Sequence, residues 1–257
     1  MTTSNLQTPA VQQNLNGKVA FVQGGSRGIG AAIAKRLALA GAAVAISYAS
    51  SPKQAQEVVQ AIEAAGGRAL ALRADSADAK AIVQAIDTTA TAFGAIDVLV
   101  NNAGVLAMGP IEDFKLEDFD RTLAINVRSV FVATQAALKY MGAGGRVITI
   151  GSTNAERMPF AGGATYAMSK AAIVGLTKGL ARDLGPRGIT VNNVQPGPVD
   201  TDMNPENSEF ASTLKGLMAI NRYGHVDEIA GFVAYLASPE AAYITGASLT
   251  IDGGFSA

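Results

Sequence analysis

The feature that most constrains the fold is a regular alternation of short β-rich runs with longer helical runs, which starts at Lys18. Such alternation is typical of βαβ units, in which helices join parallel strands and cover both faces of one sheet. We therefore expect an α/β fold built on a doubly wound sheet of seven parallel strands. The strands are expected at residues 18–23, 43–48, 68–73, 97–101, 145–151, 189–195 and 247–251, and the helices at 28–40, 53–65, 77–92, 117–141, 165–184 and 226–237.

One domain accounts for the chain. Its 257 residues, 49% of them hydrophobic, suffice for a single large α/β domain with a well-buried core. The polar start, residues 1–17, is expected to be a flexible tail, and residues 18–257 the domain itself. Residues 198–220 are polar and then amphipathic, and they follow the sixth expected strand, so we expect a mobile lid over a substrate there.

The composition excludes several classes of function. A formal net charge of −1 with scattered Lys and Arg provides no basic stripe for nucleic acid or an anionic membrane surface. The chain has no cysteine and one histidine, which excludes disulfides, thiolate chemistry and a His/Cys zinc site. No apolar run approaches the length that spans a bilayer. We expect a cytoplasmic protein with no metal site and no nucleic-acid or membrane partner.

A glycine-rich loop follows the first expected strand, with glycines at positions 24, 28 and 30 ahead of a helical run. Glycine permits positive φ and close approach of a ligand, and a helix N-terminus offers unpaired N–H groups. A plain packing turn explains the glycines equally well, and their spacing departs from the G-x-G-x-x-G fingerprint of Rossmann folds. A P-loop is excluded because Ala31, not lysine, follows Gly30. The hypothesis is a Rossmann-like cradle for a dinucleotide pyrophosphate, formed by Gly24, Ser26, Arg27, Gly28, Ile29 and Gly30.

The residues after the second expected strand bear on the choice of cofactor. A site for NAD would carry Asp or Glu there to bond the adenosine 2′-hydroxyl, but this chain has no carboxylate at that place. A 2′-phosphate fits better, because Arg27 offers a cation and the strand end offers hydroxyl groups. The alternative is that Arg27 is a solvated loop residue. NADP(H) is therefore the expected cofactor, with its phosphate near Ser47, Tyr48, Ala49 and Ser50.

Short polar residues also follow the third and fourth expected strands. Asp75 and Ser76 either accept a hydrogen bond from the adenine amine or cap the helix near residue 77. Asn102, Ala103 and Gly104 either hold a turn or contact the adenosine ribose. The sequence leaves both choices open.

The residues that carry chemistry follow the fifth expected strand. Ser152 ends that strand, and Tyr166 and Lys170 stand four residues apart on the next helix, so their side chains share one face. A charge about 4 Å from a phenolate, at a dielectric near 20, stabilises it by roughly 4 kcal/mol, which lowers a tyrosine pKa from about 10 towards 7. Such a phenol is a general acid at neutral pH, and Ser152 would hold a carbonyl oxygen beside it. Taken alone, Tyr-x-x-x-Lys is also a common surface pair.

The ordered combination of these features with Asn126 and with Pro196-Gly197 resembles the short-chain dehydrogenase/reductase family from about Lys18 to Gly254. The resemblance implies that Tyr166 donates the proton, Ser152 orients the substrate, and Lys170 binds the nicotinamide ribose while lowering the tyrosine pKa. It also implies that Asn126 holds a water in the proton relay. The remaining implied contacts are Ile189 or its neighbours and Pro196, Gly197 and Val199 with the nicotinamide, and Thr201 with its amide or the phosphates.

The resemblance further implies a homotetramer, packed through residues 117–141 and 165–184 and the C-terminal end. The chain departs from the family where Gln23 replaces the usual Thr before the first glycine, which puts one bond that braces the loop in doubt. The runs 151–159 and 195–202 are similar to the subgroup that contains cyclic-di-GMP-binding biofilm-dispersal oxidoreductases.

Two functions follow from these residues. The first is an NADPH-dependent carbonyl reductase or alcohol dehydrogenase of the 3-oxoacyl reductase-like kind, in which hydride passes between nicotinamide and a ketone or aldehyde and tyrosine supplies the proton. The alternative is a nucleotide-binding regulatory protein, a sensor of NADP or cyclic-di-GMP with little turnover. A triad hydrolase is disfavoured because the one histidine, His225, stands where a helix should begin and no G-x-S-x-G elbow is present. Candidate walls of a substrate pocket are apolar, with Arg157 as a possible partner for an anionic group: Met108, Met158, Phe160, Met203 and Leu217.

Overall fold

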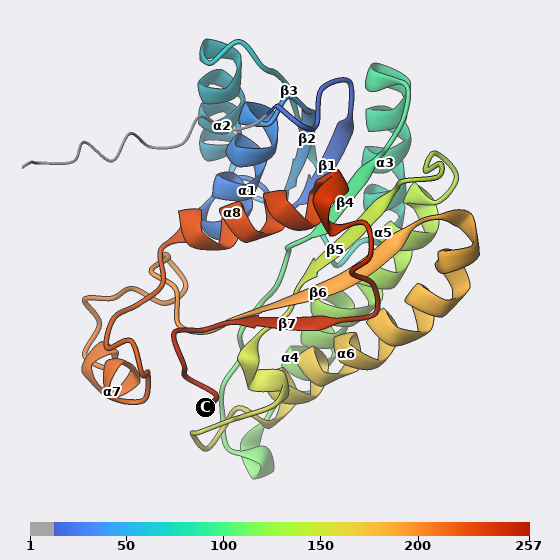
Figure 1. Cartoon of the computed structure of the whole chain (residues 1–257). Coiled ribbons are helices and arrows are strands. Elements are labelled where there is room, and N and C mark those ends of the chain that lie inside the picture. Colours follow the sequence, from blue (N-terminus) through green and yellow to red (C-terminus); the bar gives the residue numbers. More distant parts are fainter. Residues whose placement is uncertain (1–12) are drawn as a thin grey trace, which may run out of the picture.

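A computed structural model of the chain, which describes residues 13–257, contains one seven-stranded parallel sheet with helices on both faces (Figure 1). The strand order β3-β2-β1-β4-β5-β6-β7 is that of a doubly wound, Rossmann-like sheet, which confirms the expected fold class. The strands are β1 (Val19–Gln23), β2 (Ala43–Tyr48), β3 (Arg68–Arg73), β4 (Val98–Asn101), β5 (Arg146–Ile150), β6 (Thr190–Pro196) and β7 (Ser248–Ile251).

The helices fall close to the expected ranges, with two differences. They are α1 (Gly28–Leu39), α2 (Pro52–Ala64), α3 (Ala79–Phe93), α4 (Leu116–Leu123), α5 (Ser129–Ala137), α6 (Ala164–Leu184), α7 (Ala211–Gly216) and α8 (Val226–Ala237). The single helix expected at 117–141 is instead α4 and α5 joined by a wide π-helical turn, Ala124–Arg128. The short α7, inside the segment 198–220, had no counterpart in the predicted elements.

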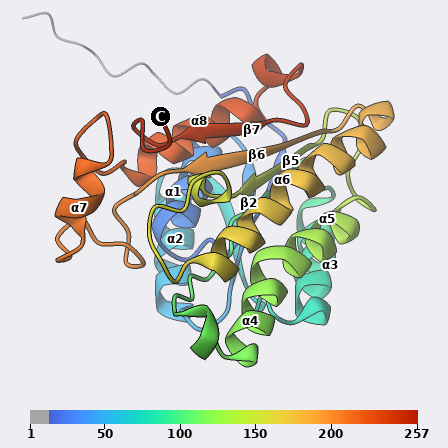
Figure 2. The same cartoon turned by 90° about the horizontal axis from the view of Figure 1, so that it is seen from below.

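Alternate strand residues face two separate cores. On one face, α1, α2 and α8 pack against residues such as Val22, Val100 and Val194. On the other, α3, α5 and α6 pack against Phe21, Leu99 and their neighbours. Figure 2 shows α8 on one side of the strands and α5 and α6 on the other. Strands buried on both faces read as continuous apolar runs, which is why the sequence predicted them well.

The fold begins before the predicted domain boundary at Lys18. Residues 1–12 of the expected flexible tail lie outside the described residues. Within residues 13–17, Leu15 is buried in the core of α1 and α2, and its N–H donates to the carbonyl of Ala40 at 2.9 Å. Leu15 therefore packs as part of the domain, whereas the other four residues of this stretch are exposed.

A row of polar side chains crosses the sheet near the carboxyl ends of its strands. The register aligns Gln23 with Asn101, Asn101 with Thr149, and Thr149 with Asn193. All four side chains are buried. Asn101 is 3.5 Å from the hydroxyls of Thr134 and Thr149, whereas both amide atoms of Gln23 lack a hydrogen-bond partner within residues 13–257. The side chains within the sheet therefore change from apolar to polar near the carboxyl ends of the strands.

We expect Gln23→Leu to stabilise the protein. An unpaired buried amide costs about 1–3 kcal/mol, and leucine removes it at nearly constant volume. The free energy of unfolding, measured by urea denaturation, should rise by about 1 kcal/mol or more. Gln195→Leu is the matched control, because Gln195 is equally buried at the end of β6 but donates to Glu156 at 3.5 Å. A Gln23→Leu protein less stable than the Gln195→Leu protein would contradict the expectation.

Candidate functional site

The glycine loop lies at the point of the sheet where the chain changes direction. β1 pairs with β2 on one side and with β4 on the other, so the loops after β1 and β4 lie side by side. The Asn102 side chain donates to the carbonyls of Gly24 at 2.9 Å and Gln23 at 3.3 Å. These two hydrogen bonds brace the glycine loop from the β4 side, whereas the Gln23 side chain makes no hydrogen bond within residues 13–257.

Steric contacts and backbone conformation favour glycine at three positions of this loop. A Cβ on Gly30 would collide with the Gly24 carbonyl oxygen and the Asn102 amide. Gly24 and Gly28 have positive φ, +70° and +53°, which other residues rarely adopt. The sequence was compatible with two explanations of these glycines, a packing turn and a ligand cradle. The close approach of Gly30 to Gly24 shows that Gly30 is needed for the packing of the turn.

The N-terminus of α1 behind this loop supports an anion site. Arg27 is the N-cap residue and makes no side-chain cap bond, and the first turn contains no acidic residue. The N–H groups of that turn therefore remain to bind an anion, aided by the helix dipole. A Cβ on Gly28 would lie 3.5 Å from the methyl group of Thr201, so Thr201 stands over the same turn. These residues fit a dinucleotide diphosphate.

Ser47 takes a different place from the one predicted. It is buried, and its hydroxyl accepts a hydrogen bond from the Gly24 N–H at 3.1 Å. The hydroxyl therefore supports the glycine loop from within the protein and does not face a 2′-phosphate. Ala49 and Ser50 are exposed beyond it, and Arg27 is exposed with a guanidinium nitrogen 3.8 Å from a carboxylate oxygen of Asp202.

The residue that caps the helix after β3 is Asp78. Its carboxylate accepts from the N–H groups of Lys80 at 2.9 Å and Ala81 at 3.2 Å. Asp75 lies three residues earlier and accepts from the Ala77 N–H at 2.9 Å, closing a turn. The predicted capping role of Asp75 and Ser76 at residue 77 is therefore wrong, because α3 begins only at Ala79.

Three predicted catalytic side chains meet at the carboxyl edge of β5. Lys170 is buried, its amino group donates to the Ile150 carbonyl at 3.0 Å, and its nitrogen lies 5.7 Å from the centre of the Tyr166 ring. Ser152 is buried at the same edge; its hydroxyl accepts a hydrogen bond from the Asn154 N–H at 3.1 Å and is near enough to the Tyr166 phenol to lower the pKa of that phenol. Placement on α6, one turn apart, puts phenol and ammonium on one face of the helix, as the spacing predicts.

Burial sets the pKa values of this pair. Tyr166 retains some exposed surface, but burial of its hydroxyl raises the pKa of the phenol, and the neighbouring Ser152 hydroxyl lowers it by less. This is opposite to the lowering that Lys170 was expected to produce. Burial likewise lowers the pKa of Lys170 to about 8. Without a cofactor, the phenol therefore stays protonated at neutral pH and the ammonium lies in poorly solvated surroundings.

Asn126 fastens the loop after β4 to α6. Its Oδ1 accepts from the Val105 N–H at 2.9 Å, and its amide nitrogen donates to the Val105 carbonyl and the Ser169 hydroxyl, each at 3.0 Å. These contacts accompany the π-helical turn that contains Asn126. A Cβ on Gly104 would lie 3.5 Å from the Lys170 nitrogen and 3.6 Å from Asn126 Oδ1, so glycine keeps the space between them open. The water implied at Asn126 remains a prediction.

Sequence reasoning missed the contacts of Arg157 and the role of Ser169. The Arg157 guanidinium donates to the Phe255 carbonyl and lies 5.6 Å from the centre of the Phe255 ring. Nothing local predicts that pairing, because the two residues are 98 apart in sequence. Ser169, by contrast, had a signal: it stands three residues after Tyr166 and so shares its helix face. His225 caps α8 as its N-cap residue, consistent with its place before a helix.

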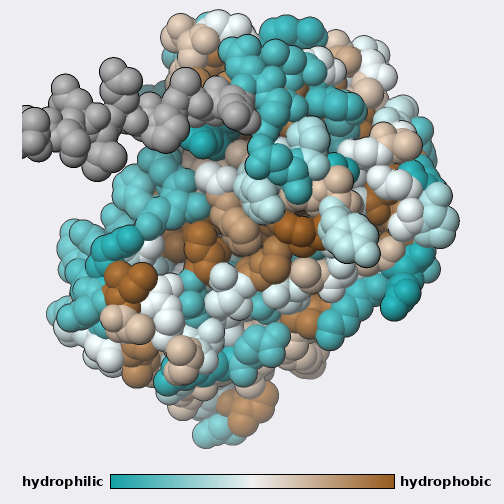
Figure 3. All heavy atoms as spheres, in the orientation of Figure 1, coloured by the Kyte–Doolittle hydropathy of each residue, from teal (hydrophilic) through white to brown (hydrophobic). Residues whose placement is uncertain are grey.

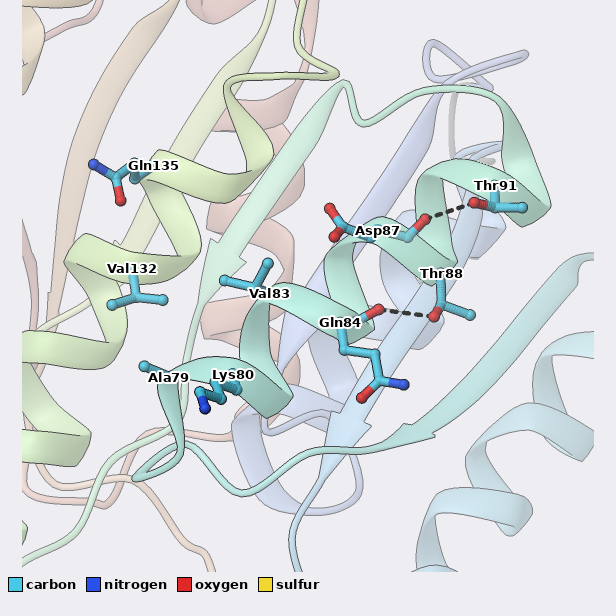
Figure 4. Close-up of a pocket in the computed structure, with 9 residues that line it drawn as sticks. All are labelled: Ala79, Lys80, Val83, Gln84, Asp87, Thr88, Thr91, Val132 and Gln135. Atoms are coloured by element: carbon cyan, nitrogen blue, oxygen red, sulfur yellow. Dashed lines mark hydrogen bonds between the residues drawn. The ribbon is translucent and has the colours of Figure 1, made fainter.

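A hollow of about 640 Å³ lies elsewhere, between α3 and α5. Figure 4 shows Val83 and Val132 facing it from the two helices, with Lys80 and Gln84 at its side. Asp87, also on its lining, accepts from the Tyr140 hydroxyl at 2.9 Å. None of the predicted site residues lines it, so it is separate from the candidate active site.

Residues 13–257 contain neither of two other classes of feature, a membrane-spanning helix or a metal cluster. No helix in that range is long and apolar enough to cross a membrane. The same range contains no cluster of three or more His, Asp or Glu residues suited to a metal ion.

Known proteins resemble this chain over nearly its whole length. The family model described as Enoyl-(Acyl carrier protein) reductase matches residues 24–256. A solved short-chain dehydrogenase/reductase from Serratia marcescens is 68% identical, with a TM-score of 0.94 over 95% of this chain and 100% of that one. A solved short chain dehydrogenase from Burkholderia cenocepacia, in complex with NADP, is 56% identical, with a TM-score of 0.94 over 95% and 100% of the two chains. The cyclic-di-GMP-binding biofilm dispersal mediator protein of Escherichia coli is 47% identical over 241 residues, 94% of this chain and 98% of that one.

Proposed function

Because the chain belongs to the short-chain dehydrogenase/reductase family, we propose that it is an NADP(H)-dependent oxidoreductase that interconverts a ketone or aldehyde and the corresponding alcohol. The observation that carries this proposal is the grouping of Tyr166 with the buried Lys170 and Ser152 at the carboxyl edge of β5. A phenol, a cation and a hydroxyl around one point are what protonation of a carbonyl oxygen requires.

The residues divide the chemistry between them. Bound NADPH supplies the hydride that reduces the carbonyl carbon. Tyr166 donates its phenolic proton to the carbonyl oxygen as negative charge develops there, and the Ser152 hydroxyl holds that oxygen by a hydrogen bond. Lys170 stabilises the phenolate that remains, because its positive charge lies in surroundings of low dielectric. A phenol whose burial keeps it protonated before the reaction is suited to act as the donor in reduction.

The preference for the phosphorylated cofactor rests on Arg27. It is an exposed cation at the first turn of α1, and the strand end after Tyr48 carries no carboxylate. The Burkholderia cenocepacia relative was solved with NADP, which supports the same choice. Arg27, Gly28, Ile29 and Gly30 would hold the phosphate groups, Asn102 to Gly104 the adenosine ribose, and Pro196 to Thr201 the nicotinamide side.

The test is turnover with purified protein. NADPH oxidation, followed by absorbance, should be detected with at least one member of a panel of ketones, diketones and aldehydes, and NADH should be the poorer cofactor. NADH used better than NADPH would refute the role of Arg27. Absence of turnover on the whole panel, together with tight binding of cyclic-di-GMP in a calorimetric titration, would favour a sensor instead, as the likeness to the Escherichia coli relative allows.

Three further features stay predictions: a mobile lid at residues 198–220, a homotetramer, and a cytoplasmic location. The exposed side chains of Phe131 on α5 and Met168 on α6 support association through these helices. Sedimentation of the purified chain would measure the number of subunits.

A further inference from the structure

We propose that the substrate of this site is an apolar carbonyl compound that carries no negative charge, so that neutral and cationic ketones are reduced and anionic ones are rejected. The proposal rests on the reductase function argued above. It comes from the three segments that follow β4, β5 and β6, namely residues 104–116, 152–163 and 198–220, which we call the rim.

The three segments of the rim touch one another beside the catalytic group. The Gly109 N–H in the first segment donates to the Gly162 carbonyl in the second at 3.0 Å. The rings of Phe160 in the second and Phe210 in the third pack edge to face, 4.6 Å between centres. Each segment leaves the carboxyl end of a parallel strand, the edge at which Ser152 lies. A substrate must therefore pass this rim to reach Tyr166.

The rim exposes large apolar side chains. Figure 3 shows hydrophobic residues at the surface around the position of α7, mixed with hydrophilic ones. Each of these side chains favours contact with an apolar substrate, because such contact removes apolar surface of both from water. The members contributed by the first and third segments are at least 43% exposed: Leu106, Met108, Ile111, Leu116, Met203, Phe210 and Ile220.

The charges of the rim are predominantly negative. Seven carboxylates stand against three cations in these segments. A substrate that carries a carboxylate or a phosphate would bring its charge among these groups, with only part of the repulsion screened inside a Debye length of about 8 Å. The carboxylates are Glu112, Asp113, Glu156, Asp200, Asp202, Glu206 and Glu209, and the cations are Lys115, Arg157 and Lys215.

The cations of the rim are poorly placed to receive an anion. Arg157, the partner that the sequence suggested for an anionic group, is held by the Phe255 carbonyl and lies over the Phe255 ring. Lys215 lies 3.9 Å from a carboxylate oxygen of Glu206 and 5.7 Å from the centre of the Tyr223 ring. Lys115 stands between acidic residues in sequence, two positions from Asp113 and from Glu117. Arg27, outside the rim, lies 3.8 Å from Asp202, but the other carboxylates of the rim still outnumber its cations, so the rim combines apolar contact surface with an excess of negative charge.

The test compares three acetophenones that differ only at the para position. These are 4-acetylbenzamide, which is neutral, 4-(aminomethyl)acetophenone, which is cationic at pH 7, and 4-acetylbenzoate, which is anionic. At low ionic strength, kcat/KM with NADPH should be at least tenfold higher for the neutral and cationic ketones than for the anion. Addition of 0.5 M NaCl should reduce that ratio several-fold, because salt screens the rim.

Charge variants separate the rim from the electronic effect of the substituent. The double variant Glu206→Gln/Glu209→Gln removes two charges from the rim and should lower the ratio several-fold. The matched control, Glu57→Gln/Glu63→Gln, removes two exposed charges from α2, which packs at the far edge of the sheet from β7, and should leave the ratio unchanged. A wild-type protein that reduces the anion as well as the others, or a ratio that responds neither to salt nor to the rim variant, would overturn the proposal.

A binding measurement keeps this proposal distinct from the reductase function. NMR titration of the wild-type chain with 4-methylbenzamide, 4-methylbenzylammonium and 4-methylbenzoate, which contain no ketone, needs no turnover. The first two should bind at least several-fold more tightly than the benzoate. If no ketone is reduced but this order of binding is found, the reductase function fails and the rim's selectivity stands. If ketones are reduced and the benzoate binds as well as the others, only the selectivity fails.

Discussion

Replacing Lys170 with methionine is expected to abolish most of the activity and at the same time to stabilise the fold. Burial holds the pKa of Lys170 at about 8, below its ordinary value of 10.5, and each pKa unit corresponds to about 1.36 kcal/mol. The protonated side chain therefore costs the folded state up to about 3 kcal/mol at pH 7. Loss of its bond to the Ile150 carbonyl offsets part of this, which leaves an expected gain of about 1–2 kcal/mol.

The pH dependence provides the check. Between about pH 8 and pH 10.5 the unfolded chain keeps its proton on Lys170 while the folded chain has lost it, so wild-type stability rises with pH through this window. The advantage of Lys170→Met should therefore be largest below pH 8 and shrink at pH 9.5. Urea denaturation of both proteins at pH 7 and pH 9.5 measures the difference, and an advantage that is absent, or constant with pH, would contradict the desolvation of Lys170. In the same proteins, kcat/KM for reduction should fall at least 100-fold in the variant.

Tyr166→Phe should lower kcat for reduction by roughly 10² to 10⁴-fold, the usual contribution of a positioned general acid. The variant keeps the ring and its packing and removes only the hydroxyl, so the dissociation constant for NADPH should stay within about twofold. Rapid mixing with NADPH measures the rate, and quenching or calorimetry measures the binding.

Tyr243→Phe is the matched control, because Tyr243 is fully exposed beyond α8 and should leave both quantities unchanged. If Tyr166→Phe retained more than a tenth of the wild-type rate, another group would have to supply the proton. If it lost NADPH binding instead, the phenol would belong to cofactor binding more than to proton transfer.

The sequence predicts the strands and helices because the sheet is buried on both faces. Val19 to Val22 and Val98 to Val100 are apolar without interruption, and the glycines mark where the helices stop. What it could not predict is the π-helical turn at Ala124–Arg128, because its Asn126 is held by Val105 and Ser169, which are distant in the chain. Tertiary bonds, not local preference, decide that turn.

The candidate site divides in the same way. The four-residue spacing of Tyr166 and Lys170 is a local geometric rule, so the pair was predictable, but the direction of the tyrosine pKa depends on packing that the spacing does not contain. Ser47 was misplaced although the sequence held a signal. Ser47 stands two positions after Ala45 in β2, so the two side chains share one face of the sheet. Ala45 is fully buried, and the Ser47 hydroxyl is therefore expected to point into the protein as well.

The strand order has a consequence for biosynthesis. β1 pairs with β4, which is synthesised only after β2 and β3. One edge of β1 therefore has no partner strand while α1 to α3 are synthesised. An apolar edge left open during synthesis invites pairing with other nascent chains. Newly made molecules therefore expose an unpaired edge of β1 until residue 101 has emerged, and chaperones that shield this interval should limit aggregation during synthesis.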